Sequence, residues 1–152
     1  QVARLAGCEV HATASTPEKR RQIEALGARA WPYDELQVRD ADVVLESVGA
    51  DTWESSLRSL RWGGRLVCCG ATSGGEVPLN LRALFFKQIE LLGSTMGSSG
   101  EMLAAWRAVT EGAIKPVVFA HARLSRLGEA HGMLERRDVI GKVVCRQDLA
   151  DA

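Results

Sequence analysis

Two hydroxyl side chains, Ser15 and Thr16, stand just before two basic side chains, Lys19 and Arg20, in the segment ASTPEKR that begins at Ala14. The proline of this segment suits the first turn of a helix, and a Ser or Thr before it suits the N-cap. Hydroxyls and an ammonium group near a helix N-terminus favour an anion such as a phosphate. The alternative is that the hydroxyls only cap the helix and the basic side chains are solvated.

In a dinucleotide-binding fold, this segment would follow the second strand, at the ribose of the adenosine. Folds that prefer NAD place an Asp or Glu there, which accepts hydrogen bonds from the 2′-hydroxyl. The chain has Ala14 followed by two hydroxyls in place of that acid. A carboxylate would repel a 2′-phosphate, whereas hydroxyls and an ammonium group would bind one. We therefore predict NADPH as the cofactor over NADH, with Ser15, Thr16 and Lys19 at the 2′ position.

Two more loops, made mostly of small residues, end two neighbouring buried strands. In open α/β sheets, ligands bind at the carboxyl ends of the strands, and small residues there let a flat ligand approach the backbone. The backbone amides of these loops would hold ribose, pyrophosphate or carboxamide, and the segment Gly93–Gly97 (GSTMG) repeats the pattern at the next strand. The alternative is a set of turns that satisfy their own backbone groups. The two loops contain Ser47, Val48 and Gly49, and Gly70, Ala71 and Thr72.

The composition indicates one ordinary globular domain. The chain has 152 residues, of which 46% are hydrophobic and 25% charged. Nineteen basic residues balance nineteen acidic ones, and this balance without a basic stripe argues against nucleic acid as the main partner. No apolar run approaches the ~20 residues of a membrane span, and no signal peptide is visible. We expect a cytoplasmic protein without membrane contact.

The cysteines and histidines show no pattern of a metal site or a catalytic triad. The four cysteines include no Cys-x-x-Cys pair, so zinc-ligand spacing is absent from them. We expect buried and reduced thiols in a cytosolic protein. The three histidines are far apart in the sequence, and we expect structural roles for them. The sequence therefore assigns no catalytic residue and no metal ligand.

The hydrophobic pattern alternates between strands and helices with short connections. This alternation predicts an α/β fold with a doubly wound parallel sheet and right-handed crossovers. The run DVVLES at 42–47 is nearly continuous in apolar residues, which suits a strand covered on both faces. We expect strands at 9–14, 31–33, 42–47, 65–69, 89–95, 117–122 and 141–145, and helices at 17–26, 52–60, 81–87, 100–112 and 125–136.

The first six residues read as the end of a helix with Gly7 as its C-cap. No N-cap precedes them, and six or seven residues do not form a stable helix alone. We therefore expect the chain to be an N-terminal truncation that begins within a helix.

Three stretches together resemble the nucleotide-binding domain of the medium-chain dehydrogenase/reductase superfamily. The chain is most similar to the branch of quinone oxidoreductases and zinc-type alcohol dehydrogenase-like proteins. Single stretches are weak signals, but their order along the chain is specific. They read ATASTPEKRRQIEALGA at 12–28, DVVLESVGADTWESSLRSLRWGGRLVCCGATSGGEVPLNLRALFFKQIELLGSTMG at 42–97, and EAHGMLERRDVIGKVV at 129–144.

The resemblance implies a Rossmann-type sheet of strand order 3-2-1-4-5-6. It also implies hydride transfer between NAD(P)H and a small molecule such as a quinone, enone, aldehyde or alcohol. It places Tyr33 near the adenine, Lys142 near the pyrophosphate or the domain junction, and a homodimer contact at the strand edge 89–95. Along the nicotinamide it places Val48, Gly70, Ala71, Thr72, Ser94, Thr95 and Met96.

The resemblance also implies missing parts. The first strand, the glycine-rich turn of G-x-G-x-x-G type, and the N-terminal domain with the substrate pocket and any zinc ligands precede the matched region in the family. We expect one nucleotide-binding domain over 1–152, with 117–152 returning toward that N-terminal domain, and an isolated fragment that is unstable, rearranged or completed by another chain. The alternative function is a non-catalytic dinucleotide-binding regulatory or structural module. A methyltransferase-type Rossmann domain is a third possibility, but it would also need an acid where Ala14 stands.

Overall fold

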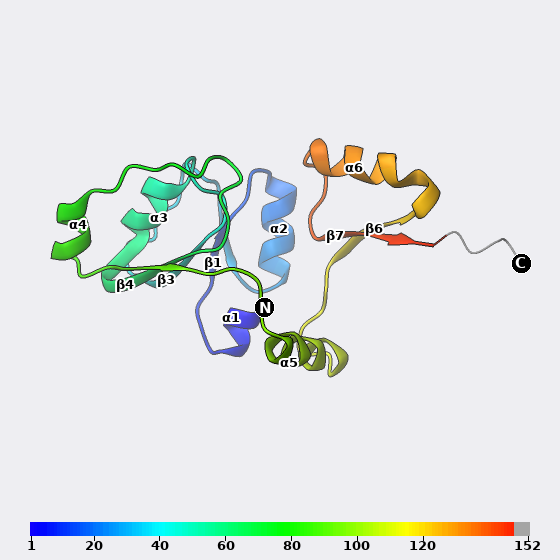
Figure 1. The fold of residues 1–152 in the computed structure, drawn as a ribbon, viewed down its shortest axis with the longest axis horizontal. Coiled ribbons are helices and arrows are strands. Elements are labelled where there is room, and N and C mark those ends of the chain that lie inside the picture. Colours follow the sequence, from blue (N-terminus) through cyan, green and yellow to red (C-terminus); the bar gives the residue numbers. More distant parts are fainter. Residues whose placement is uncertain (148–152) are drawn as a thin grey trace, which may run out of the picture. The chain divides into compact units, whose positions relative to one another are not determined.

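The computed structural model describes residues 1–147 of the chain (Figure 1). These residues form two compact units. The larger unit is Ala6–Ser98, and the smaller unit combines Gln1–Leu5 with the chain from Ser99 onward. Each unit is built from helices and parallel strands, which confirms the expected α/β class.

The larger unit begins with a strand, a helix and a second strand. They are β1 (His11–Thr13), α2 (Pro17–Ala25) and β2 (Arg29–Trp31), and the two strands pair in parallel. The second strand begins and ends two residues earlier than the expected 31–33. The next residue, Pro32, has no backbone N–H with which to extend the ladder.

A three-stranded parallel sheet follows in the order β3-β4-β5. Its core lies in the central strand, where Leu60 and Leu66 are 0% and 1% exposed. Helix α3 packs against β3 and β4 (Figure 1). The elements are β3 (Ala41–Glu46), α3 (Trp53–Ser59), β4 (Leu60–Cys68), α4 (Leu81–Phe86) and β5 (Glu90–Gly93).

Strand β4 begins five residues before the expected 65–69. Leu60 pairs with Ala41, and the register then shifts before Arg65 pairs with Val43. Gly63 in this irregular stretch has a φ of 67°, a conformation that glycine adopts without strain. Gly63 and Gly64, which precede the expected strand 65–69, are therefore part of β4.

The smaller unit contains α1 (Val2–Leu5), α5 (Ser99–Thr110), β6 (Val118–Arg123), a 3₁₀ turn η1 (Leu124–Arg126), α6 (Leu127–Glu135) and β7 (Lys142–Arg146). Strands β6 and β7 pair in parallel. The side chain of Gln1 binds the backbone of Lys115 through both its amide nitrogen and its amide oxygen, at 2.9 and 2.8 Å. The return of 117–152 toward another domain stays a prediction, and its last five residues lie outside the described part.

The strands of the larger unit do not form one continuous sheet. Strands β1 and β2 form one ladder, and β3, β4 and β5 form another. In the expected order 3-2-1-4-5-6, the break between β1 and β3 falls where the first strand of the family's sheet belongs.

The expectation that 42–47 is covered on both faces is wrong. Within β3, Val43 is 49% and Leu45 is 71% exposed. Val43 and Leu45 are two residues apart and therefore share one face of β3, and the described residues leave that face partly uncovered. A nearly continuous apolar run reports burial only when all the neighbouring strands and helices are in place.

The expectation of buried thiols is also wrong. All four cysteines are free, but Cys8, Cys69 and Cys145 are exposed and Cys68 is half-buried. Cys69 lies just beyond the end of β4 and Cys8 lies between α1 and β1, so neither belongs to a strand interior.

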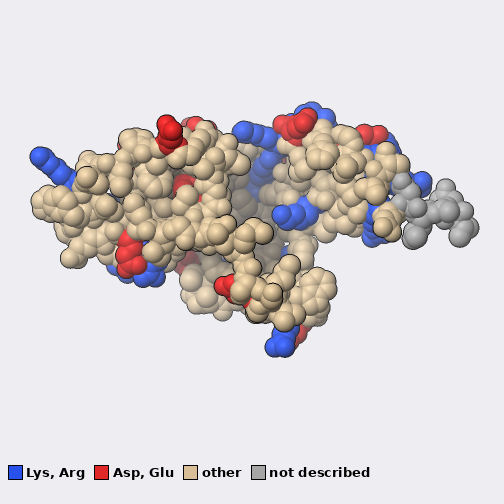
Figure 2. All heavy atoms as spheres, viewed as in Figure 1, with Lys and Arg blue, Asp and Glu red and all other residues tan. Residues whose placement is uncertain are grey.

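No helix within residues 1–147 has the length and apolar character needed to cross a membrane. The face drawn in Figure 2 carries basic and acidic side chains dispersed among neutral ones. Strand β5 is an edge strand of its sheet, and a homodimer contact through that edge stays a prediction.

Candidate cofactor site

Two loops at the carboxyl ends of β3 and β4 are joined by hydrogen bonds into one body. We call these loops, residues 47–52 and 70–75, the rim. Ser73 donates to the carbonyl oxygen of Val48 from both its amide nitrogen, at 2.7 Å, and its hydroxyl, at 2.8 Å. The hydroxyl of Thr72 donates to the carbonyl oxygen of Ser47 at 3.2 Å. The loops that the sequence assigned separately to the cofactor therefore form a single structure.

Glycines allow the two loops of the rim to touch. A Cβ atom at Gly49 would lie 2.4 Å from the carbonyl oxygen of Gly74, and the φ of Gly49 is 95°. A Cβ atom at Gly70 would lie 2.8 Å from the carbonyl oxygen of Ser47. We expected small residues here to let a ligand approach the backbone. At these two glycines, it is the neighbouring loop that makes the close approach.

A buried carboxylate, Glu46, holds the first loop of the rim from inside. Glu46 is 2% exposed, and its Oε1 accepts from the amides of Val48 at 2.7 Å and Gly49 at 3.0 Å. The hydroxyl of Thr52 donates to both carboxylate oxygens at 2.9 and 3.0 Å, and the hydroxyl of Ser56 donates to Oε2. The amides of Val48 and Gly49 are thus occupied within the protein, as in the alternative of a self-satisfied turn.

The charge of Glu46 is stabilised by these contacts. Burial raises the pKa of its carboxyl group, but the hydrogen bonds from Ser56, Gly49, Val48 and Thr52 outweigh burial and lower the pKa below the usual range. The sequence reasoning did not select Glu46, because it read 42–47 as an apolar run. A usable signal was present, since Thr52 and Ser56 are four residues apart and share one helix face.

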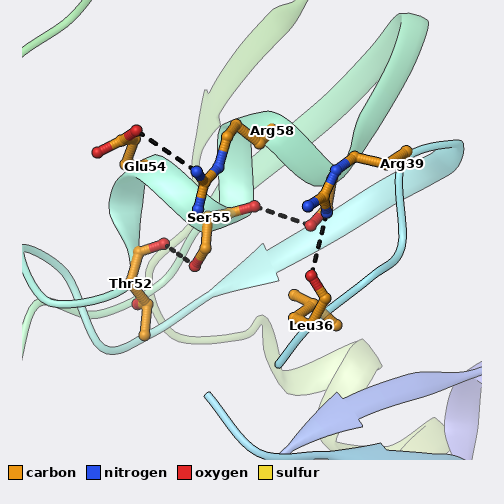
Figure 3. Close-up of polar contacts among 7 residues, drawn as sticks. Leu36, Arg39, Thr52, Glu54, Ser55 and Arg58 are labelled. Carbon is orange, nitrogen blue, oxygen red and sulfur yellow. Dashed lines mark hydrogen bonds and ion pairs between the residues drawn. The ribbon is translucent and has the colours of Figure 1, made fainter. Parts of the chain in front are cut away.

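Helix α3 is fixed by polar contacts at its beginning. Figure 3 shows the carbonyl oxygen of Thr52 accepting from the hydroxyl of Ser55, at 2.8 Å, and the ion pair of Glu54 with Arg58, at 3.7 Å. Nearby, the guanidinium of Arg39 donates to the carbonyl oxygen of Leu36 at 3.1 Å. Thr52 therefore serves both the helix, through its backbone, and Glu46, through its side chain.

Other amides of the rim remain available to a ligand. Among residues 1–147, no protein acceptor binds the backbone amides of Ala71 and Thr72. Both residues are exposed. Thr72 can also accept a hydrogen bond through its hydroxyl oxygen while donating to Ser47. These donors fit the carbonyl, hydroxyl or phosphate oxygens of a bound dinucleotide.

The loop after β5 lies at the same edge of the sheet as the rim. Gly93 pairs with Cys68, and the amide of Ser94 donates to the carbonyl oxygen of Cys68 at 2.9 Å. Ser94, Thr95 and Met96 are all exposed, and Met96 is 95% exposed with a φ of 49°.

The segment after β1 is the capped start of helix α2. Thr16, and not Ser15, is the N-cap of α2, and its hydroxyl accepts from the amide of Lys19 at 3.3 Å. The guanidinium of Arg20 donates to the carbonyl oxygen of Ala14 at 3.1 Å, which brings a second cation to the end of β1.

The same segment contains one carboxylate, Glu18. It is exposed and pairs with Arg21 at 3.0 Å. Its pKa is lowered first by a hydrogen bond to its own backbone, and Arg21 adds to the effect. The carboxylate lies in the first turn of α2 and not at the strand end that Ala14 occupies.

Two predicted contacts lie outside these loops. Tyr33 is two residues beyond β2 and is 43% exposed. Lys142 begins β7 in the smaller unit and is exposed. Their predicted roles at the adenine and the pyrophosphate stay predictions.

The comparisons with known proteins agree on one family. The family model described as zinc-binding dehydrogenase matches residues 1–111. A probable quinone oxidoreductase of Schizosaccharomyces pombe is 34% identical, with 100% of this chain and 52% of that protein covered. An acryloyl-coenzyme A reductase of Metallosphaera sedula is 28% identical, with 95% of this chain and 45% of that protein covered.

Solved structures show the same fold. A crystal structure of an NAD-dependent alcohol dehydrogenase is 36% identical and superposes with a TM-score of 0.87, with 95% of this chain and 46% of that chain covered. The chain therefore spans about half the length of the relatives and structures that it matches.

Proposed function

The chain belongs to the zinc-binding dehydrogenase family of medium-chain dehydrogenases and reductases, and we propose that it forms the NADPH-binding part of an oxidoreductase. The observation that supports this proposal is the rim at the carboxyl edge of parallel strands, where open α/β sheets bind ligands. The substrate is a quinone, enone, aldehyde or alcohol. Catalytic groups for it would come from outside these 152 residues.

The segment after β1 supports NADPH over NADH. Ala14 occupies the strand end where an acid would bind the 2′-hydroxyl, and the hydroxyls and cations beside it suit a 2′-phosphate. The cations are Lys19 and, held on the carbonyl oxygen of Ala14, Arg20. One solved relative carries the name NAD-dependent, so family membership alone does not decide between the two cofactors.

At the other end of the dinucleotide, the rim would hold the half of the cofactor that carries the nicotinamide. The amides of Ala71 and Thr72 would donate to oxygen atoms of the ligand, and the exposed loop Ser94–Met96 would border it. When bound, the dinucleotide supplies or accepts the hydride. The residues of this chain bind and orient it.

Zinc does not fit the described part of the chain. Within residues 1–147, no three or more His, Cys, Asp or Glu side chains come together in a group that could hold a metal ion. A zinc ion in the whole protein would need ligands from outside this part, and we derive no chemical step through it.

The test of this function compares NADPH and NADH binding to the protein that carries this chain. We expect NADPH to bind at least about tenfold more tightly, because a lost charge-assisted contact costs about 1.4 kcal/mol or more. Lys19→Ala should narrow this preference, since it removes an ammonium group from the 2′ position. The measurement is a fluorescence titration that gives a Kd for each cofactor.

The matched control is Arg21→Ala, which removes a cation of the same helix that pairs with Glu18. It should change both Kd values by less than about twofold, within the range of a surface ion pair. Equal affinities for NADPH and NADH before mutation would contradict the cofactor assignment. Tight binding without turnover of any carbonyl or enone substrate would favour the non-catalytic module.

A further inference from the structure

One buried carboxylate has no part in the chemistry described above. Glu46 is the last residue of β3, is 2% exposed, and pairs with Cys68 in the neighbouring strand. Its own carbonyl oxygen accepts from the amide of Cys69 at 2.8 Å, just before the second loop of the rim begins. Glu46 therefore lies at the point where both loops leave the sheet.

Four groups donate hydrogen bonds to the two oxygens of Glu46. Two are amides of the loop, from Val48 and Gly49, and two are hydroxyls of Thr52 and Ser56. None of these four groups carries a charge. An ionised carboxylate offers about four acceptor sites, so these donors match its capacity. A neutral amide or acid in this position would place a donor against one of them.

This arrangement takes the place of an ordinary helix cap. Thr52 precedes α3, but its side chain makes no capping hydrogen bond to the helix and donates to Glu46 instead. The carboxylate thereby connects the loop to the first two turns of α3.

Glu46 holds the first loop of the rim, and this first loop positions the second loop. The carbonyl oxygens of Ser47 and Val48 accept three hydrogen bonds from Thr72 and Ser73. The amide of Ala50 also donates to the carbonyl oxygen of Gly74 at 3.2 Å. A change in the course of residues 47–50 would therefore displace the residues that carry the available amides of Ala71 and Thr72.

We propose that Glu46 is a positioning residue for the cofactor, which holds the first loop of the rim so that the second loop presents its amides to the dinucleotide. This inference rests on the proposed function. It assigns to Glu46 an effect on cofactor affinity that acts through the rim, without contact with the cofactor.

The test is Glu46→Gln in the protein that carries this chain, with two readouts. The NADPH Kd should rise at least tenfold at a temperature well below the melting transition. Amide hydrogen exchange without cofactor should speed up in residues 47–52 and 70–75. Glu46→Asp, which keeps the charge, should restore part of the affinity.

The matched control is Glu54→Gln, which neutralises an exposed carboxylate on α3 that pairs with Arg58. It should leave the Kd and the exchange of the rim unchanged within twofold. If Glu46→Gln does not fold, Thr52→Val removes one donor and leaves the carboxylate with three, and it should raise the Kd two- to fivefold.

A folded Glu46→Gln variant with an unchanged Kd would overturn the proposal, as would a folded Thr52→Val variant with an unchanged Kd. A purely structural role would lower the melting temperature while leaving the Kd the same. Failure of the proposed function gives a different result, because the unaltered protein would then bind no dinucleotide at all.

Discussion

At the scale of single residues, the charge of Glu46 links stability to pH. Hydrogen bonds hold its pKa below the ordinary value, so its contribution is present above the pKa of the unfolded chain and is lost as the pH falls through the lowered pKa of the folded chain. We expect the free energy of unfolding to fall as the pH drops through about 4.5, where an unfolded glutamate is about half protonated.

Urea denaturation between pH 7 and pH 3 measures this effect. The difference in stability between the unaltered protein and Glu46→Gln should be largest at pH 7 and should shrink as the medium becomes acidic. A difference that is the same at pH 7 and pH 3 would show that the charge of Glu46 contributes nothing. Glu54→Gln again serves as the control, since no residue buries that carboxylate.

Gly49 provides a second prediction at this scale. Gly49→Ala should destabilise the protein by about 2 kcal/mol or more, because the residue has a φ of 95° and a Cβ would meet the carbonyl oxygen of Gly74 at 2.4 Å. Gly75→Ala is the matched control in the same rim, where a Cβ would find open space within 4 Å. The denaturant midpoint of unfolding, measured for each variant, checks this prediction. Equal midpoints for Gly49→Ala and Gly75→Ala would refute the close contact between Gly49 and Gly74.

The sequence predicted some residues of the site well and others not at all. Thr16 was a candidate cap because the proline after it and its own hydroxyl act locally, and the structure shows that cap. Glu46 was missed because its two hydroxyl partners lie six and ten residues further along and its burial depends on α3 packing beside β3. Exposure of Leu45 and Cys69 was missed for a similar reason, since burial depends on neighbouring elements.

At the scale of elements, the break between β1 and β3 is the main feature. Neighbouring strands in a sheet lie about 4.8 Å apart, so one absent strand separates its two neighbours by about 10 Å. Within residues 1–147, strand β1 pairs only with β2, and β3 pairs only with β4. The break could be predicted from the sequence, because the family resemblance implies the order of the strands and the place of the missing one. Local sequence patterns would not have predicted it.

This break predicts poor stability for the 152-residue chain alone. Two-stranded ladders are marginal in water, and the separated edges leave backbone groups without ladder partners. We expect the isolated chain to unfold without a sharp two-state transition as a monomer. Adding one parallel strand at its N-terminus, as in the family's complete sheet, should restore a cooperative melt.

Calorimetry and sedimentation of the isolated and extended chains measure the difference. A sharp two-state melt of the isolated chain, with a monomeric mass at the same concentration, would contradict the expectation. Equally cooperative melting of the two chains would show that the unpaired edges of β1 and β3 do not lower the free energy of unfolding.

At the scale of the whole molecule, we propose that this chain supplies binding determinants for a dinucleotide and that it holds no catalytic group. The loops after β1, β3, β4 and β5 each follow the carboxyl end of a parallel strand in the larger unit. The α/β class followed from the alternation of strands and helices, whereas the division into two units had no signal in the sequence.

The most direct test of this account is amide hydrogen exchange in the protein that carries this chain, measured without and with saturating NADPH. We predict that NADPH slows exchange in residues 14–20 and 70–75 and leaves α4 (Leu81–Phe86) unchanged. Binding of NADPH that leaves both of these segments unprotected, or that protects only residues outside them, would contradict the assignment of the cofactor to the rim and to the start of α2.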